Sequence, residues 1–366
     1  MTKREKWDMS RPDTKAKRDE IVHGTFVKEG TMVAFPTCFP GVTVPIPYDE
    51  SHITALTTST DGAIYGGTSG RRTHCFVGMF HGITGLVFDL GVVEGANRCE
   101  GVCCTGDEFF VGVNGKGGGR LIKGRKQPLP FDLLQEWWFT RTPLHDLGRP
   151  IEGERIVDLA TAGGKVLGIT ESHLFGLRDG EEIEILAELN GPAEGDLGVE
   201  PMGEILGTYE NGIWRYDPVA DEFEPDAVHC NGDFSSGVSW AADTSGKNLY
   251  CGDGSGKLFS LDFDEYSLVL VGEAPLAPIG PMATTTDGRL FGFCGHGISK
   301  LFCYDPVQLP VRDLGAAVSV IERRRYGYEF GAATPGRDGE IVFGEDDDLG
   351  HLWLYFPRVR RADATI

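Results

Sequence analysis

A unit of about forty residues that recurs seven times is the feature that most constrains the fold of this sequence. Each copy reads as a small-residue turn, a short apolar strand that ends in glycine, a polar turn and a second apolar strand. The clearest copies are DGAIYGGTSGRRTHCFVGMF (61–80), DGRLFGFCGHGISKLFCYDP (287–306) and DGEIVFGEDDDLGHLWLYFP (338–357). A repeat of this length, built from short strands and glycine turns, is typical of a β-propeller. Because one blade cannot bury both of its faces, we predict an all-β, seven-bladed β-propeller closed into a ring.

The turn glycines set the register of this repeat. They are spaced by 44, 58, 39, 43, 42 and 51 residues. Glycine suits these positions because tight turns often need a positive φ, which other residues adopt at a cost. The seven positions are Gly62, Gly106, Gly164, Gly203, Gly246, Gly288 and Gly339.

The domain organisation follows from where the repeats begin and end. We expect a single propeller domain over residues 23–357, between tails at 1–22 and 358–366. The last repeat ends at Pro357 without a fourth strand of its own. We therefore predict that residues 25–35 supply this strand and close the ring, which removes the exposed edges of an open array of sheets.

The net charge of the chain disfavours some classes of binding partner. It has 34 lysines and arginines against 55 aspartates and glutamates, a formal net charge of −21. Such acidity disfavours non-specific binding to nucleic acid or to an anionic membrane. No apolar run of about eighteen residues occurs, so no membrane-spanning helix is expected, and the charged start lacks the apolar stretch of a secretory signal. We expect a cytoplasmic protein.

Metal and cofactor motifs are weak. Several of the nine cysteines lie inside strand patterns, which favours buried free thiols in a reducing compartment. The cluster of Cys99, Cys103 and Cys104 lacks the second half of a zinc site, and the aspartates at 346–348 do not follow a calcium-loop spacing. We expect no cofactor, with zinc and calcium as alternatives. Neither G-x-S-x-G nor H-E-x-x-H occurs, so serine hydrolases and zinc proteases have no support.

One face of the ring is the candidate ligand site. In a four-stranded blade, the turn between the second and third strands and the link to the next blade emerge on the same face. These segments are rich in histidine, arginine and tyrosine, which predicts a cationic, aromatic funnel that would concentrate anionic small molecules. Alternatively, each such side chain only bonds to the turn behind it. We predict as substrate-binding residues Arg98, Arg120, Arg325, Lys257, His296 and His52, and as catalytic residues His74, His173, His229, His351, Tyr326 and Tyr328.

The last blade carries a family resemblance. Residues 323–357, RRRYGYEFGAATPGRDGEIVFGEDDDLGHLWLYFP, resemble the closing blade of bacterial seven-bladed propellers that act on uronate-containing glycans. These include lyases of the ulvan and rhamnose–glucuronate type and a related glycosidase. With the blade that begins at Asp287, the resemblance covers about a quarter of the chain. It implies β-elimination, in which a histidine and a tyrosine transfer protons while an arginine neutralises the uronate carboxylate.

We therefore expect a lyase whose partner is an acidic oligosaccharide. The first alternative is a glycoside hydrolase at the same funnel. The second is a non-catalytic scaffold that binds a basic protein or peptide at its acidic rim, and the third is a lyase or isomerase of a non-carbohydrate substrate. A deep pocket lined by histidine, arginine and tyrosine would favour an enzyme, whereas a flat rim with exposed apolar residues would favour the scaffold.

Overall fold

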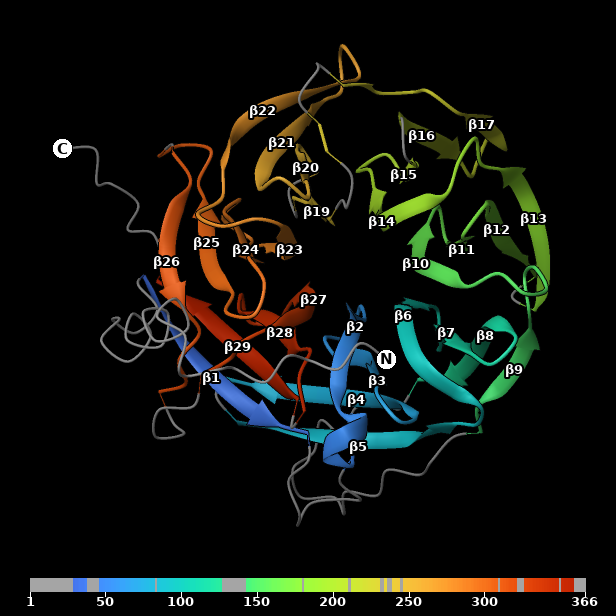
Figure 1. The fold of residues 1–366 in the computed structure, drawn as a ribbon, viewed down its shortest axis with the longest axis horizontal. Helices are drawn as coiled ribbons and strands as arrows, with labels where there is room; N and C mark the ends of the chain where they lie inside the picture. Colours follow the sequence, from blue (N-terminus) through green and yellow to red (C-terminus); the bar gives the residue numbers. More distant parts are fainter. Residues whose placement is uncertain are drawn as a thin grey trace, which may run out of the picture.

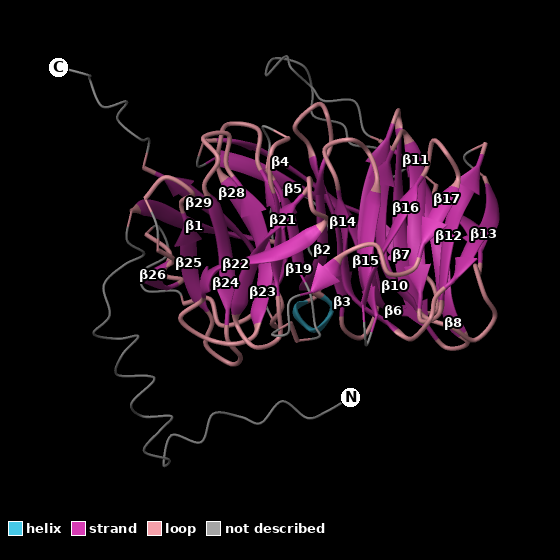
Figure 2. Ribbon diagram, turned by 90° about the horizontal axis from the view of Figure 1, so that it is seen from above, coloured by secondary structure: helices cyan, strands magenta, loops and turns pink. Residues whose placement is uncertain are grey.

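The computed structural model confirms the predicted all-β ring of seven blades (Figure 1). The blades follow one another around a central axis in chain order, and η1 (Tyr48–Glu50), the one helical turn among the described residues, lies on one face of the ring (Figure 2). Residues 1–22 and 359–366 of the predicted tails lie outside the described part. The structure describes residues 29–37, 46–82, 84–126, 143–179, 181–209, 212–230, 234–235, 239–243, 246–308, 310–320, 326–348 and 350–358.

Blades 1 to 4 each contain four antiparallel strands, ordered along the chain from the axis outwards. Blade 1 consists of β2 (His52–Thr58), β3 (Ile64–Ser69), β4 (Thr73–His81) and β5 (Thr84–Val93). Blade 2 consists of β6 (Ala96–Thr105), β7 (Glu108–Gly115), β8 (Gly118–Arg125) and β9 (His145–Gly148). Blade 3 consists of β10 (Ile156–Ala162), β11 (Lys165–Thr170), β12 (His173–Arg178) and β13 (Glu182–Glu188). Blade 4 consists of β14 (Ala193–Val199), β15 (Ile205–Tyr209), β16 (Gly212–Asp217) and β17 (Glu222–Glu224).

Blades 5 to 7 depart from this order in two places. Blade 5 gains a short fifth strand, β18 (His229–Cys230), which pairs parallel with its outer strand β22. The other strands of blade 5 are β19 (Ser239–Ala242), β20 (Leu249–Gly252), β21 (Lys257–Asp262) and β22 (Ser267–Glu273). Blade 6 consists of β23 (Ile279–Thr284), β24 (Leu290–Cys294), β25 (Lys300–Tyr304) and β26 (Arg312–Ala316). Blade 7 consists of β27 (Phe330–Pro335), β28 (Ile341–Glu345), β29 (His351–Pro357) and the N-terminal β1 (Gly30–Pro36).

Ring closure by an N-terminal strand is also confirmed. Strand β1 runs antiparallel to β29, with Gly30 opposite Pro357, and the two lie side by side in Figure 1 as a blue and a red strand. An ion pair between Glu29 and Arg312, 2.7 Å from Oε1 to Nη1, ties the start of β1 to blade 6. The two ends of the described chain therefore complete blade 7, and this closes the ring.

The repeated glycines occupy the turns between the first and second strands, as the spacing predicts. All seven have positive φ, between 52° and 94°. In four of these turns the glycine N–H donates to the carbonyl three residues earlier, as from Gly62 to Ser59 at 2.8 Å. Glycine recurs there because the turn requires a left-handed residue.

Apolar side chains between neighbouring blades form the core. The rings of Phe293 and Phe330 stack between blades 6 and 7 with centroids 3.7 Å apart, and Tyr65 stacks on Phe109 between blades 1 and 2. The eight described cysteines are unpaired thiols, as predicted, and most of them are buried in this core. Burial raises the pKa of thiols such as that of Cys75, to about 12, so they stay protonated and unreactive at neutral pH.

A buried carboxyl between blades 4 and 5 makes stability depend on pH. Glu200 is 3% exposed, and the Tyr266 hydroxyl donates to its Oε2 at 3.1 Å and to Glu204 at 3.0 Å. The single hydroxyl proton of Tyr266 can be donated to only one of the two carboxylates at a time. Burial and the charge of Glu204 raise the pKa of Glu200 to about 7 from its ordinary 4.5.

The Glu200→Gln variant tests this carboxyl. The folded chain holds the Glu200 proton more tightly than the unfolded chain, so folding stability falls as pH rises from 4.5 to about 7. We expect Glu200→Gln to raise the free energy of unfolding by about 1–2 kcal/mol at pH 8 and by little at pH 5. Urea unfolding at the two pH values measures the difference. Glu222→Gln, at an exposed site on the same blade, is the control, and equal effects of the two variants would contradict the assignment.

Candidate functional site at the channel mouth

The first strands of the seven blades enclose a channel of about 400 Å³ along the ring axis. Small and polar side chains make up much of its lining, with Thr54, Thr57, Thr58 and Thr161 among them. A cavity of this size accommodates a small ligand or a few sugar units. The channel is therefore a place in the described ring where a ligand can be surrounded by protein.

Three carboxyl side chains from consecutive blades line the channel: Glu100 on β6, Asp158 on β10 and Asp196 on β14. Each lies at or beside a shift in the pairing register between the first and second strands of its blade. Such an irregularity changes which way a side chain leaves its strand, which is how an inner strand can aim a charged residue into a channel. All three stand in the first two-thirds of their strands, towards the face that carries the blade-to-blade links. We call Glu100, Asp158 and Asp196, together with Arg98 and Arg155, the channel mouth.

The three carboxyls have different surroundings. Asp196 is surrounded by protein, yet its side chain stays open to the channel. Burial and the charge of Glu100 raise the pKa of Asp196 to about 6. Burial and the charge of Asp196 raise the pKa of Asp158 further, against the N–H of Leu197, which donates to Asp158 at 2.8 Å. Burial also raises the pKa of Glu100, but Arg98 opposes it. Glu100 is thus the carboxyl of the three whose ionised form a guanidinium stabilises directly.

Two exposed guanidinium groups border these carboxyls. Arg98 donates from Nε to Oε1 of Glu100 at 2.6 Å, and its side chain is 59% exposed. Arg155 is 64% exposed and pairs with Glu171, and its charge acts on Glu100. Each guanidinium has further N–H groups for a carboxylate of an incoming ligand.

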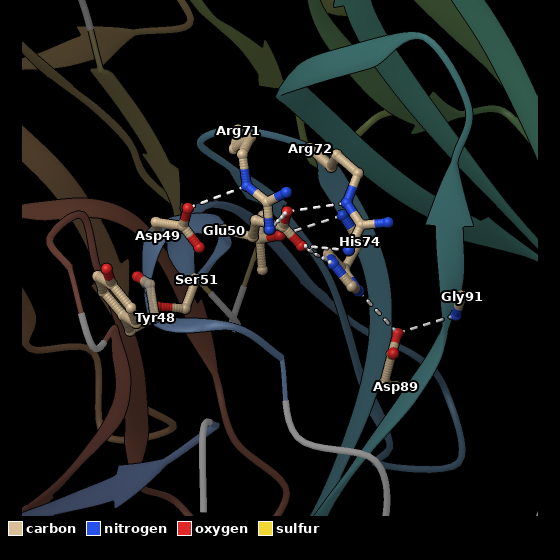
Figure 3. Close-up of polar contacts among 10 residues, drawn as sticks. Tyr48, Asp49, Glu50, Ser51, Arg71, Arg72, His74, Asp89 and Gly91 are labelled. Atoms are coloured by element: carbon tan, nitrogen blue, oxygen red, sulfur yellow. Dashed lines mark hydrogen bonds and ion pairs between the residues drawn. The ribbon is translucent and has the colours of Figure 1, made fainter.

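The predicted catalytic residue His74 is held between two carboxylates (Figure 3). Its Nε2 lies 2.8 Å from Glu50 and its Nδ1 lies 3.2 Å from Asp89. Burial alone would lower the pKa of His74, but the bonds to Asp89 and Glu50 outweigh it and raise that pKa. A carboxylate oxygen at each ring nitrogen favours the doubly protonated ring and leaves neither nitrogen open to accept a proton from a substrate.

Glu50 is the centre of this network, and sequence reasoning missed it. Its side chain has no exposed surface and accepts from Arg71, Arg72 and His74 (Figure 3). Glu50 belongs to η1, in the link from blade 7 to blade 1, whereas its three partners come from the β3–β4 turn and from β4. The network thus anchors the link to blade 1.

The other predicted histidines fall into two groups. His52 bonds to Asp346 and Asp348, at 2.9 Å each, so two of the aspartates considered for calcium hold this ring instead. His173 lies 3.3 Å from Glu154, and the buried His351 lies 3.1 Å from Glu345. The second group has exposed side chains away from the channel lining, and it consists of His229 on β18 and His296 between β24 and β25.

The remaining predicted residues complete this comparison. Arg120 pairs with Asp146 at 2.6 Å, and Lys257 opens β21 as predicted. Tyr326 is half-buried and Tyr328 is 37% exposed, while Arg325 lies outside the described residues. The face predicted from the repeat thus combines paired charges with channel carboxyls, whereas the sequence predicted a cationic, aromatic funnel.

The described residues contain no three histidine, cysteine or carboxylate side chains arranged to hold a metal ion. That statement includes the channel carboxyls and the Cys99, Cys103 and Cys104 cluster. No helix in the described ranges is long and apolar enough to cross a membrane.

Comparisons with known proteins bear on the fold. No family model and no curated protein matches the sequence. The chain is similar in structure to a catalytically inactive virginiamycin B lyase from Staphylococcus aureus with quinupristin, with a TM-score of 0.64, 10% identity, and coverage of 90% of this chain and 99% of that one. It is also similar to YCF48 bound to D1 peptide, with a TM-score of 0.57, 15% identity, and coverage of 93% and 98%.

A further neighbour is the extracellular domain of a putative one-component system from B. thetaiotaomicron, with a TM-score of 0.57 and 13% identity. The match covers 89% of this chain, which spans 40% of the length of that one. These neighbours have mixed functions, and none supports a uronate polysaccharide lyase specifically. Together with the sheet order, they establish that the chain is a seven-bladed β-propeller.

Proposed function

We propose that this propeller is a carbohydrate-active enzyme that cleaves a glycosidic bond of a short acidic oligosaccharide at the channel mouth. The observation that carries the proposal is a set of carboxyls that line one channel, of which Glu100 is paired with a guanidinium and Asp196 has a raised pKa, bordered by exposed guanidiniums. Hydrolysis of a glycosidic bond by two carboxyls needs one that is protonated and one that is not. Hydrolysis is the form of cleavage that this set supports best.

The roles follow from the environments. Asp196, protonated below pH about 6, donates its proton to the glycosidic oxygen as that bond breaks. Glu100, ionised, takes a proton from the water whose oxygen attacks the sugar carbon. Water is thereby divided between the two products, and the carboxyls return to their starting states by exchange with solvent. Arg98 and Arg155 bind the uronate carboxylate and orient the sugar ring.

Both donors to Glu100 act on the same oxygen. Arg98 and Asn114 donate to Oε1, and no described residue donates to Oε2. Oε2 is the oxygen that would meet water. His52 and His74 offer no comparably unpaired base, since both ring nitrogens of each lie against carboxylates.

Elimination, the reaction predicted from the sequence, would use the same residues differently. Arg98 would neutralise the uronate carboxylate, and Glu100 would remove the adjacent proton. The eight cysteines in the described part of the chain are free thiols, which agrees with a reducing, cytoplasmic setting, in which the substrate would be an imported oligosaccharide.

A panel of glucuronate- and galacturonate-containing oligosaccharides, each beside a neutral counterpart, tests the proposal. New reducing ends without the ultraviolet absorbance of an unsaturated uronate indicate hydrolysis. The same ends with that absorbance indicate elimination. If neutral sugars are turned over equally well, the arginines do not bind a uronate carboxylate during the reaction. If no member of the panel is turned over, the proposal is overturned in favour of a binding scaffold.

The pH dependence of kcat provides a sharper test. Activity should rise as Glu100 loses its proton and fall as Asp196 loses its own, with the alkaline limb near pH 6. Asp196→Asn should remove that limb and lower kcat by about a hundredfold. Asp243→Asn, on the first turn of blade 5, is the control that should keep the profile. An unchanged alkaline limb in Asp196→Asn would show that another group is the acid.

A further inference from the structure

Asn114 on β7 is a buried amide, 5% exposed, at the seam between blades 2 and 3. Its Nδ2 donates to the carbonyl of Ile156 at 2.8 Å, and its Oδ1 accepts the N–H of the same residue at 2.9 Å. The side chain thus pairs with the first residue of β10 as a neighbouring peptide group would. Exchange of its oxygen and nitrogen would place like groups against Ile156, so the backbone determines the orientation of the amide.

The second N–H of the Asn114 amide points away from Ile156. It donates to Oε1 of Glu100 at 3.1 Å, the oxygen that also accepts from Arg98. Asn114 stands opposite Arg98 in the pairing of β6 with β7, so the two donors approach Glu100 from neighbouring strands. Asn114 therefore joins two of the strands that carry channel carboxyls, β6 with Glu100 and β10 with Asp158.

We infer that Asn114 is a positioning residue of the channel mouth, which holds Glu100 by one oxygen and leaves the other for the reaction. The inference rests on the proposed function for its catalytic meaning, and on hydrogen bonds alone for its structural part. In this role, the hydrogen bond from Asn114 favours Glu100 over the other channel carboxyls as the base. A negatively charged Glu100 is the form that two donors on one oxygen stabilise.

The charges around Glu100 agree with this role. Burial raises the pKa of Glu100, while Arg98, Asn114 and Arg155 lower it. The charge on Glu100 in turn raises the pKa values of Asp196 and Asp158. Loss of the Asn114 donor should therefore let Glu100 hold a proton at higher pH and let Asp196 release its own more easily.

The test is the Asn114→Asp variant, which keeps the acceptor for the N–H of Ile156 and puts a carboxylate oxygen in place of the nitrogen that donates to Glu100 and to the Ile156 carbonyl. Carbon NMR of the side-chain carboxyls measures the pKa of Glu100 directly, with the signal assigned through Glu100→Gln. We expect an upward shift of about one unit or more, shared between positions 100 and 114 as in other close carboxyl pairs. Asn248→Asp is the matched control, because Asn248 likewise donates to a carboxylate, that of Asp243 at 3.1 Å, in the first turn of blade 5.

On substrate, Asn114→Asp should move the acidic limb of the kcat profile upward and lower kcat by about tenfold, with a smaller change in KM. If Asn114→Asp does not fold, Asn114→Ser should shift the Glu100 signal in the same direction by less. An unshifted Glu100 signal in a folded Asn114 variant would overturn the inference, whatever the enzyme does. A shifted signal in a protein that turns over no oligosaccharide would uphold the hydrogen-bonding role and reject the proposed function.

Discussion

The Glu100→Gln variant is expected to lose about a thousandfold in kcat, within the range of 10²–10⁴ seen when a general base is removed. Glutamine has nearly the same shape as glutamate and retains an oxygen that can accept from Arg98 and Asn114. The fold of the channel mouth should therefore survive, and the loss should come from the missing charge. Because Arg98 and Arg155 still bind the carboxylate of the sugar, KM should change by much less than kcat.

The measurement is steady-state hydrolysis of whichever uronate oligosaccharide the wild type cleaves. Glu273→Gln is the matched control, since it makes the same chemical change at the exposed end of the outer strand of blade 5. It should retain wild-type activity. A Glu100→Gln enzyme that kept more than about a tenth of the wild-type kcat would remove Glu100 from the role of base.

The largest loss of stability is expected from Glu50→Gln. The substitution leaves the positive charges of Arg71, Arg72 and His74 without the carboxylate that holds them together. Removing one partner of a buried ion pair costs about 3–5 kcal/mol. Glu50 has no exposed surface, but it lies directly beneath two guanidinium groups that are 60% and 44% exposed. Water can reach those charges, so we expect a loss of about 2–3 kcal/mol.

Chemical denaturation at neutral pH measures this loss, and Asp49→Asn is the matched control. Asp49 pairs with Nε of Arg71 at 2.9 Å, but its side chain is 39% exposed, so its loss should cost less than about 1 kcal/mol. Equal effects of the two substitutions would contradict a central role for Glu50. The link that Glu50 anchors leads into β2, so a weakened network should also loosen the seam between blades 7 and 1.

The stability of this network should also depend on pH. The pKa of His74 is raised above its unfolded value, so its contribution is present in full at acidic pH and is lost as pH rises through the folded pKa. The difference between wild type and Glu50→Gln should therefore be smaller at alkaline pH than at pH 6.

Much of the fold was predictable because the relevant signals are local. Gly62, Gly203 and their equivalents mark turns whose backbone only glycine enters easily, and a turn is specified by adjacent residues. The ring closure by β1 was predictable for a different reason. The last repeat lacks a fourth strand, and one apolar segment near the start of the chain had no blade of its own.

The candidate site was only partly predictable. The topology of a blade places His74, His173 and His351 at the start of third strands, where the repeat predicts them. Their carboxylate partners could not be identified from the sequence. The partners of His74 lie 24 and 15 residues away, in a link and in the fourth strand, at no spacing that a motif would reveal. The sequence thus identified the position of His74 but not the two carboxylates that hold its ring.

The sequence by itself determined the number of blades, the positions of their turns and the strand that closes the ring, because each depends on residues close together in the chain or on a count of repeats. The tertiary structure alone decided that Glu100, Asp158 and Asp196 meet at the channel. Their side-chain directions depend on register shifts in three separate blades, and a shift of one residue turns a side chain to the other face of its sheet. Only the packed ring brings the three together, where burial and mutual repulsion raise the pKa values of Asp158 and Asp196.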